Sequence, residues 1–201
     1  MIAIVDYGMG NLRSVTNAFR TLGADIAVTR DPEVMRKSHA LVVPGVGAFG
    51  KCIENLDRFG LIEVIKEQIS DGKPYLGICL GMQILLESSE EAPGVDGLGV
   101  VKGRVVRFQG SMKIPHMGWN NAKIVKPQSI FESIPDGSYF YFVHSYYPDP
   151  VEDVAATITD YGVSFVSSLQ KGNVFASQFH PEKSQAVGLR LLRNFVKSCG
   201  Q

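Results

Sequence analysis

The chain has 201 residues, of which 45% are hydrophobic and 20% charged, and its 20 Lys and Arg balance its 20 Asp and Glu. This balance argues against a nucleic-acid-binding protein, which carries a basic excess or a basic stripe. The longest runs without a charged residue have 13 members (38–50 and 74–86), whereas a membrane span needs about 20. The start lacks the basic segment of a signal peptide, and three cysteines make no disulfide framework. We therefore expect a cytoplasmic protein without a membrane segment.

The first half of the chain alternates short apolar runs with segments of helical periodicity. Apolar runs indicate strands at 2–5, 26–29, 40–43 and 75–78. Helical spacing indicates helices at 12–22, 61–69 and 81–87. Because these strands lack polar alternation, both of their faces should be buried, as in a parallel sheet covered by helices.

The second half shows mainly strand patterns until helical periodicity returns at 187–199. The expected strands are 104–108, 122–125, 139–143, 154–159, 164–169 and 174–179. No repeat and no second hydrophobic core separates the two halves. We predict one domain over residues 1–201 with an α/β, flavodoxin-like three-layer sandwich, in which a mostly parallel central sheet carries an antiparallel β extension.

The strand at 75–78 runs directly into the sequence Gly-Ile-Cys-Leu-Gly at 77–81 and then into a helix. This is the pattern of a nucleophile elbow with sulfur in place of oxygen. The two glycines leave room for the sharp turn, which lifts the Cys79 sulfur to the carboxyl edge of the sheet beside a helix N-terminus, where a thiolate is favoured. The alternative is a buried cysteine that only fills space under the turn.

His180 and Glu182 offer the base that a nucleophilic cysteine needs and the carboxylate that orients it. They follow an apolar strand and lie two positions apart, so an extended backbone puts both side chains on the same side. Pro181 between them fixes its own φ and stiffens this geometry. The alternative is a surface histidine in a strand-to-helix connection.

The sequence Pro-Gly-Val-Gly-Ala-Phe-Gly at 44–50 has the glycine spacing of a dinucleotide-binding loop. It follows the third strand rather than the first, and the next strand ends without an acidic residue for a ribose. We therefore interpret it as an oxyanion loop. One amide from Val46 or Gly47 and a second from Leu80 would stabilise the tetrahedral intermediates of acyl transfer. A plain tight turn is the alternative.

The remaining cysteines and histidines carry weaker signals. Cys52 and Cys199 fall on helical faces and are interpreted as packing residues. No cysteine and histidine cluster has the spacing of a zinc site. We expect no metal and no cofactor.

Taken together, these motifs resemble the class I (triad) glutamine amidotransferases, and the resemblance covers the whole chain. It implies that Cys79 is the nucleophile, that His180 is the base and acid, and that Glu182 orients His180 during hydrolysis of L-glutamine. It also implies that the glutamine is held by a group of residues beside the nucleophile. These are Gln83, His144, Ser145 and Tyr146.

Four further motifs resemble one branch of that family, whose members form a heterodimer with a (β/α)₈-barrel synthase. They lie at 6–15, 44–50, 115–120 and 182–184. Ammonia released into neutral water is protonated, and the chain has no segment left over to accept it, so a docked partner and a protected passage are expected. The expected partner face consists of Asn11, Pro115, Met117, Trp119, Asn120 and Lys183. The alternative for Trp119 is a place in the core.

A chain that depends on a partner in this way should hydrolyse glutamine slowly alone and faster in the complex. Three other functions remain open at this point. They are a different amidotransferase subunit of the same fold, a non-catalytic module that binds a phosphate ligand at the glycine-rich loop, and a cysteine peptidase.

Overall fold

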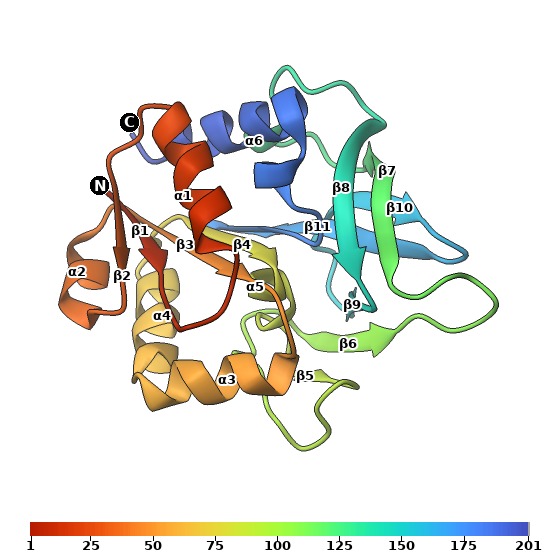
Figure 1. Cartoon of the computed structure of the whole chain (residues 1–201), viewed down its shortest axis with the longest axis horizontal. Helices are drawn as coiled ribbons and strands as arrows, with labels where there is room; N and C mark the ends of the chain where they lie inside the picture. Colours follow the sequence, from red (N-terminus) through yellow and green to blue (C-terminus); the bar gives the residue numbers. More distant parts are fainter. Residues whose placement is uncertain (201) are drawn as a thin grey trace.

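The computed structural model describes residues 1–200, and its centre is a sheet of nine strands in the order β2-β1-β3-β4-β12-β11-β10-β7-β8 (Figure 1). The first five run parallel: β2 (Ile26–Thr29), β1 (Ile2–Val5), β3 (Ala40–Gly45), β4 (Tyr75–Cys79) and β12 (Val174–Ser177). The other four alternate in direction: β11 (Ser164–Lys171), β10 (Ala155–Asp160), β7 (His116–Ile124) and β8 (Ser138–His144). A small second sheet joins β5 (Ser88–Ser89), β6 (Gly103–Arg107) and β9 (Tyr146–Pro150). The expected parallel sheet with an antiparallel extension is therefore confirmed.

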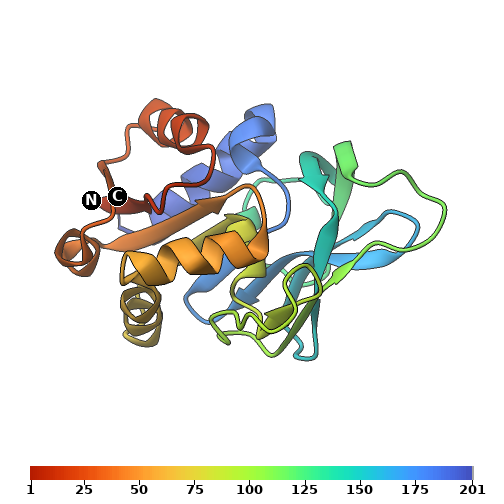
Figure 2. The ribbon, with the colours of Figure 1, turned by 60° about the horizontal axis from the view of Figure 1, so that its bottom comes forward.

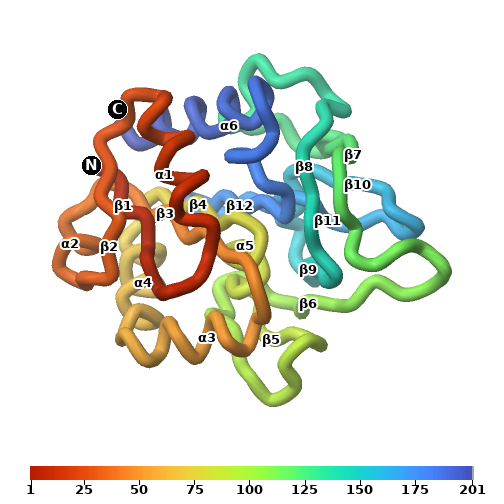
Figure 3. Tube along the Cα trace, in the orientation of Figure 1, coloured from red at the N-terminus to blue at the C-terminus, as the bar shows by residue number. Residues whose placement is uncertain are grey.

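Helices cover both faces of the parallel part, which gives the three expected layers (Figures 1 and 2). One face carries α1 (Leu12–Thr21) and α6 (Gln185–Ser198), and the other carries α3 (Phe49–Arg58) and α4 (Leu61–Ser70), with α2 (Pro32–Lys37) near the edge strand β2. The helices α1 and α6, close to the two ends of the chain, lie side by side (Figure 3).

Alternation along β1 shows why this sheet needs two helical layers. Ile2 and Ile4 point into the core that includes Phe19 of α1, whereas Ala3 and Val5 point into the core of α3 and α4. All four residues are buried, and a strand buried on both faces must be apolar at every position. None of the helices in residues 1–200 combines the length and the apolar character that crossing a membrane requires.

The strand β12 joins the two halves and positions the site. It pairs in parallel with β4, where Ser177 lies opposite Ile78, and antiparallel with β11. On the other side of β4, Gly45 at the end of β3 lies opposite Cys79. The chain therefore leaves β3, β4 and β12 at one edge of the sheet, beside the point where strand direction changes. Open α/β sheets bind ligands in such a place.

Some elements differ from the sequence-based expectations. The helix expected at 81–87 is the short α5 (Leu80–Gln83). It ends there because residues 97–101 pair with the following turn, as in the bonds from Leu98 N to Ile84 O (2.7 Å) and from Val101 N to Leu85 O (2.9 Å). The strand expected at 122–125 begins at His116, and no range was expected for α2, α3, β5 or β9.

Candidate active site

Cys79 stands on a sharp strand-to-helix turn. It is the last residue of β4, immediately before α5, and its φ of 55° and ψ of −104° lie outside the regions that L-residues favour. The flanking glycines make the turn possible: a Cβ on Gly81 would overlap the carbonyl oxygen of Val43, and one on Gly77 would overlap the carbonyl oxygen of Gly81. The Tyr75 hydroxyl fixes the turn by donating to the Gly81 carbonyl (2.8 Å).

His180 and Glu182 form a hydrogen-bonded pair beside this turn. The distance from His180 Nδ1 to Glu182 Oε1 is 2.8 Å, and each side chain is only 1% exposed. They meet around the single 3-10 turn η2 (Pro181–Lys183), not along an extended strand as expected. Because the carboxylate can only accept, Nδ1 carries the proton, and Nε2 has no hydrogen-bond partner among the described residues.

Electrostatics favour the charged imidazole in this place. Burial alone would lower the pKa of His180, but the nearby Cys79 sulfur and the Glu182 carboxylate outweigh it and raise the pKa. An imidazole with these two neighbours can take the proton of a thiol and hold it. The three residues expected to form a triad are therefore brought together.

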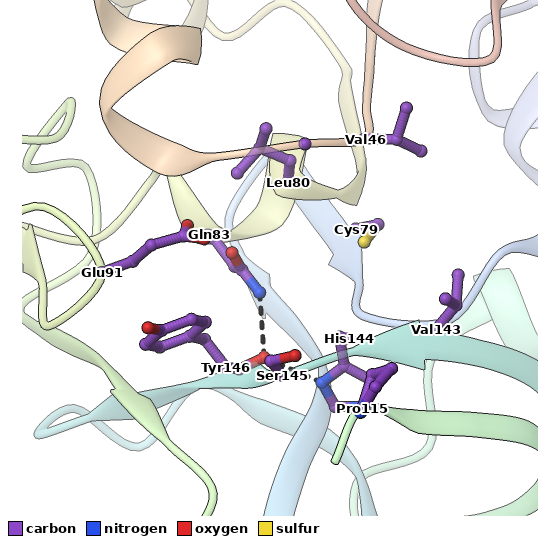
Figure 4. A pocket seen from close by; sticks show the side chains of 11 residues that line it. Val46, Cys79, Leu80, Gln83, Glu91, Pro115, Val143, His144, Ser145 and Tyr146 are labelled. Carbon is purple, nitrogen blue, oxygen red and sulfur yellow. Dashed lines mark hydrogen bonds between the residues drawn. The ribbon is translucent and has the colours of Figure 1, made fainter.

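A cavity of about 380 Å³ opens in front of the Cys79 sulfur (Figure 4). Its walls come from the loop after β3, from α5, and from the end of β8 with the start of β9. In Figure 4, Val46 lies on one side of the sulfur, and Val143 and His144 lie on the other. The lining residues are Val46, Gly47, Cys79, Leu80, Gln83, Glu91, Pro115, Val143, His144, Ser145 and Tyr146. All of the residues expected to hold glutamine or to supply oxyanion donors line this one space.

A buried tyrosine anchors the loop at 44–50. The buried Tyr7 hydroxyl donates to the Pro44 carbonyl at 2.8 Å. Gly45 leaves room for this hydroxyl, since a Cβ there would lie 2.5 Å from it. Gly47 has a φ of 111°, which only glycine adopts without strain. The loop thus brings Val46 and Gly47 to the cavity, where the choice of oxyanion donor stays a prediction.

Gln83 and His144 bind a shared backbone oxygen. The carbonyl of Tyr146 accepts from Gln83 Nε2 (3.0 Å) and from His144 Nδ1 (2.8 Å), as the dashed lines in Figure 4 show. The other ring nitrogen of His144 faces His116 Nδ1 at 2.9 Å. Both nitrogens of His144 are therefore used within the protein, so this residue shapes the cavity wall rather than offering a free polar atom.

The two neighbouring histidines are held neutral. Burial lowers the pKa of His144 to about 3 and that of His116 to about 4. Since His144 Nδ1 donates to a carbonyl, its Nε2 must accept, and His116 Nδ1 must carry a proton. His116 Nε2 then accepts from the Asn120 amide at 3.2 Å. Every nitrogen in this group has a partner of the correct polarity.

Part of the expected partner face lies on β7 next to the cavity. Met117 is 60% exposed and Trp119 is 47% exposed, so the alternative of a core tryptophan is wrong. The Trp119 ring packs edge-on against the Tyr141 ring, with 6.2 Å between the ring centres. Lys183 Nζ lies 5.6 Å from the centre of the Tyr141 ring. Pro115, at the cavity wall, precedes this strand.

The two asparagines of that expected face lie in different settings. The Asn120 amide is used inside the fold, where it donates to His116 Nε2 and, at 3.0 Å, to the Asp160 carbonyl. Asn11 precedes α1 on the opposite side, next to Gly10, whose backbone approaches the Pro44 carbonyl. The expected face therefore surrounds the site from two sides.

Gln178 was not anticipated as part of the site. It is fully buried, and its Nε2 lies 3.4 Å from Cys79 Sγ. Its Oε1 accepts from Gln83 Nε2 at 2.9 Å. The one available signal was an amide in an otherwise apolar strand end, two residues before His180.

Comparison with known proteins shows which family shares this arrangement. The family model described as glutamine amidotransferase class-I matches residues 3–199. The imidazole glycerol phosphate synthase subunit HisH of Methanothermobacter thermautotrophicus is 54% identical over 197 residues, with 98% of both chains covered. The subunit of the same name from Methanocaldococcus jannaschii is 50% identical, with 98% of this chain and 99% of that one covered. A crystal structure titled as a glutamine amidotransferase superposes with a TM-score of 0.79 at 21% identity over both whole chains, a likeness of fold.

Proposed function

The chain belongs to the class I glutamine amidotransferases, and from this premise we propose that it is the glutaminase subunit of an imidazole glycerol phosphate synthase. It hydrolyses L-glutamine to L-glutamate and ammonia. The ammonia serves a cyclase reaction that forms imidazole glycerol phosphate and 5-aminoimidazole-4-carboxamide ribonucleotide in histidine biosynthesis. Family membership speaks against a peptidase and a non-catalytic phosphate-binding module. Identity near 50% over whole chains speaks against another amidotransferase subunit.

The observation that carries the mechanism is the buried His180–Glu182 pair beside the Cys79 sulfur at the cavity wall. His180 Nε2 takes the thiol proton, and the thiolate attacks the side-chain amide carbon of glutamine. The C–S bond forms while the carbonyl electrons move onto oxygen. Backbone amides of Leu80 and of Val46 or Gly47 stabilise that oxyanion.

His180 then gives its proton to the amide nitrogen, the C–N bond breaks, and ammonia leaves a γ-glutamyl thioester on Cys79. Water enters the position of the ammonia, and His180 Nε2 removes a proton from it. The resulting tetrahedral intermediate collapses with loss of the thiolate, which releases glutamate. Glu182 holds the imidazole in one tautomer throughout and stabilises its charged form, as the raised pKa of His180 requires.

Glutamine fits the cavity by its chemistry. Gln83 Nε2 is used by Tyr146 and Gln178, which leaves its Oε1 to accept from the substrate's ammonium group. Ser145 and Tyr146 provide polar groups on the opposite wall. We infer that these residues hold the amino-acid end of the substrate, while its amide reaches Cys79.

We also propose that a (β/α)₈-barrel cyclase subunit docks as the second half of a heterodimer on the face around Met117, Trp119 and Lys183. The exposure of Trp119 on β7, the strand that follows Pro115 at the cavity wall, supports this, because large aromatic side chains are frequent interface anchors. Docking there would cover the cavity and shield ammonia from water. Activity should accordingly be low alone and rise with the loaded partner. Equal turnover with and without the partner would remove this proposal.

The single nine-stranded sheet that runs through both halves supports the expectation of one amidotransferase domain over 1–201. All three cysteines are free, which fits the reducing conditions of the cytoplasm, where we place the protein.

The test of the function is glutamine hydrolysis by the complex with the cyclase subunit. We expect Cys79→Ala to abolish hydrolysis without loss of fold or partner binding. Cys199→Ala is the matched control and should leave the rate close to that of the unmodified protein. Retention of hydrolysis in Cys79→Ala would rule out the mechanism.

A further inference from the structure

Gln178 is a fully buried amide that the triad leaves unused. It follows β12, in the segment that leads to His180, and its Nε2 is the hydrogen-bond donor to the Cys79 sulfur (3.4 Å). A buried amide in contact with a reacting atom is more than packing, since every such group must be satisfied and oriented. The question is which end of the amide faces the sulfur.

The surrounding bonds allow one answer. A backbone carbonyl can only accept, so the end of Gln83 that faces the Tyr146 carbonyl at 3.0 Å is its NH₂ group. The same NH₂ lies 2.9 Å from one end of the Gln178 amide, which must therefore be the oxygen. The NH₂ of Gln178 is then the end directed at Cys79 Sγ.

Turning the Gln178 amide over would break this order at both ends. Its NH₂ would meet the NH₂ of Gln83, and its oxygen would face the sulfur. The Tyr146 carbonyl is also held by His144 Nδ1 at 2.8 Å, so the acceptor that sets the order is fixed from a second side.

We propose that Gln178 is a further catalytic residue: its amide N–H donates to the Cys79 sulfur, stabilises the thiolate, and directs the thiol proton toward His180. The proposal rests on the proposed function, in which Cys79 is the nucleophile. A sulfur that accepts from Gln178 cannot also donate its proton in that direction. The S–H bond therefore points elsewhere, and His180 Nε2 is the buried acceptor that has no other hydrogen-bond partner among the described residues.

Proton transfer then needs no rearrangement. The S–H bond breaks, a proton forms the new N–H bond on Nε2, and the electron pair stays on sulfur, where the Gln178 N–H still faces it. The other titratable groups around this position are Glu182, Tyr7 and His144, and Glu91 and Tyr146 line the same cavity. The Glu91 carboxylate accepts from the Phe49 backbone N–H at 2.8 Å. Burial raises the pKa of Tyr7 and lowers that of His144, so both are neutral near pH 7. The Gln178 amide is thus a neutral donor that supports the negative sulfur together with the imidazolium.

Alkylation of Cys79 by iodoacetamide tests the proposal directly, because only the thiolate reacts. The rate is measured against pH on the whole chain, and the modified cysteine is identified by peptide mapping. We expect Gln178→Met to move the midpoint of the rate profile up by about one pH unit, the usual strength of a hydrogen bond to a charged group. Gln178→Glu keeps the shape of the side chain and the bond from Gln83 but places a carboxylate at the sulfur. It should therefore move the midpoint to a still higher pH.

Gln68→Met is the matched control, since Gln68 is a buried glutamine on α4 in the layer away from the cavity, and its midpoint should stay unchanged. In the complex with the cyclase subunit, the Gln178 variants should lower kcat for glutamine with little change in KM. A loss of packing alone would not shift the alkylation profile.

An unchanged midpoint in folded Gln178→Met and Gln178→Glu would overturn the proposal. If the methionine variant does not fold, the isosteric glutamate variant decides alone. An alkylation midpoint that depends on Gln178, in a protein that hydrolyses no glutamine with its partner, would refute the proposed function and leave only the support of the thiolate by Gln178.

Discussion

Replacing Cys79 by alanine and by glycine separates the strain at the turn from the chemistry of the sulfur. A non-glycine residue held in a sparsely populated backbone region costs about 1–3 kcal/mol, and Cys79 has a φ of 55°. Alanine keeps that strain, whereas glycine releases it. Two other terms make the glycine variant less stable than the alanine variant. Glycine lacks a buried methyl group, which costs about 0.8 kcal/mol, and it loses more chain entropy on folding, which costs about 0.5–1 kcal/mol.

Cys52 supplies the comparison that removes those two costs. It is equally a buried cysteine, but it lies inside the regular helix α3, where glycine should be less stable than alanine by about 1–2 kcal/mol in total. The difference between glycine and alanine should therefore be about 1–3 kcal/mol more favourable at Cys79 than at Cys52.

Urea unfolding of the four variants measures this difference. For a domain near 200 residues each kcal/mol corresponds to about 2–4 °C in Tm, so melting curves give a second reading. Both Cys79 variants should lack glutaminase activity, since the nucleophile is gone. An equal penalty for glycine at both positions would refute the claim that the elbow is strained.

Three further predictions concern the base, the buried histidine and the partner face. Glu182→Gln should lower the pKa of His180 and reduce hydrolysis of glutamine by the complex on the order of 10²–10⁴-fold; a loss below tenfold would count against an orienting carboxylate. Because the pKa of His144 is about 3 when folded and 6.5 when unfolded, its contribution to stability is complete above pH 6.5. It falls with pH through that window, reaching a loss of about 2 kcal/mol at pH 5. A ring signal of His144 that titrates near 6.5 by NMR would contradict this. Trp119→Ala should weaken cyclase binding about 30-fold or more, unlike Val28→Ala on the distant edge strand.

Local pattern was sufficient for the parallel strands and for the three residues that meet at the Cys79 turn. Gly81 is required by close contact with the Val43 backbone and Gly77 by close contact with the Gly81 backbone, so the glycine spacing itself indicated the turn. The pair His180 and Glu182 was found for a reason that is partly wrong. They meet around one 3-10 turn, because Pro181 ends the extended backbone immediately after His180.

The errors arose where distant segments decide the local structure. The helix after Cys79 ends at Gln83 because residues 97–101 donate hydrogen bonds to the backbone carbonyls that follow it. No residue near Gln83 in the sequence indicates that pairing. The strand β7 was expected six residues too late, because His116, Gly118 and two asparagines interrupt its apolar residues. Its pairing with β8 fixes the extended backbone there. Gln178 escaped for the same reason, since its role depends on Gln83, a residue 95 positions away.

The direction of the buried hydrogen bonds links the two halves of the site. The Tyr146 carbonyl accepts on both sides, so the bonds point toward it from Gln83 and from the histidines His144 and His116. Protonation of His144 at Nε2 would leave Nδ1 donating to that carbonyl, but it would set the new N–H against the N–H of His116 Nδ1. The low pKa values of His144 and His116 therefore preserve the bond between the two rings, whereas the orientation of the Gln178 amide follows from Gln83 and the Tyr146 carbonyl. It follows that acidification should cost stability through the two histidines without turning the Gln178 amide away from the sulfur.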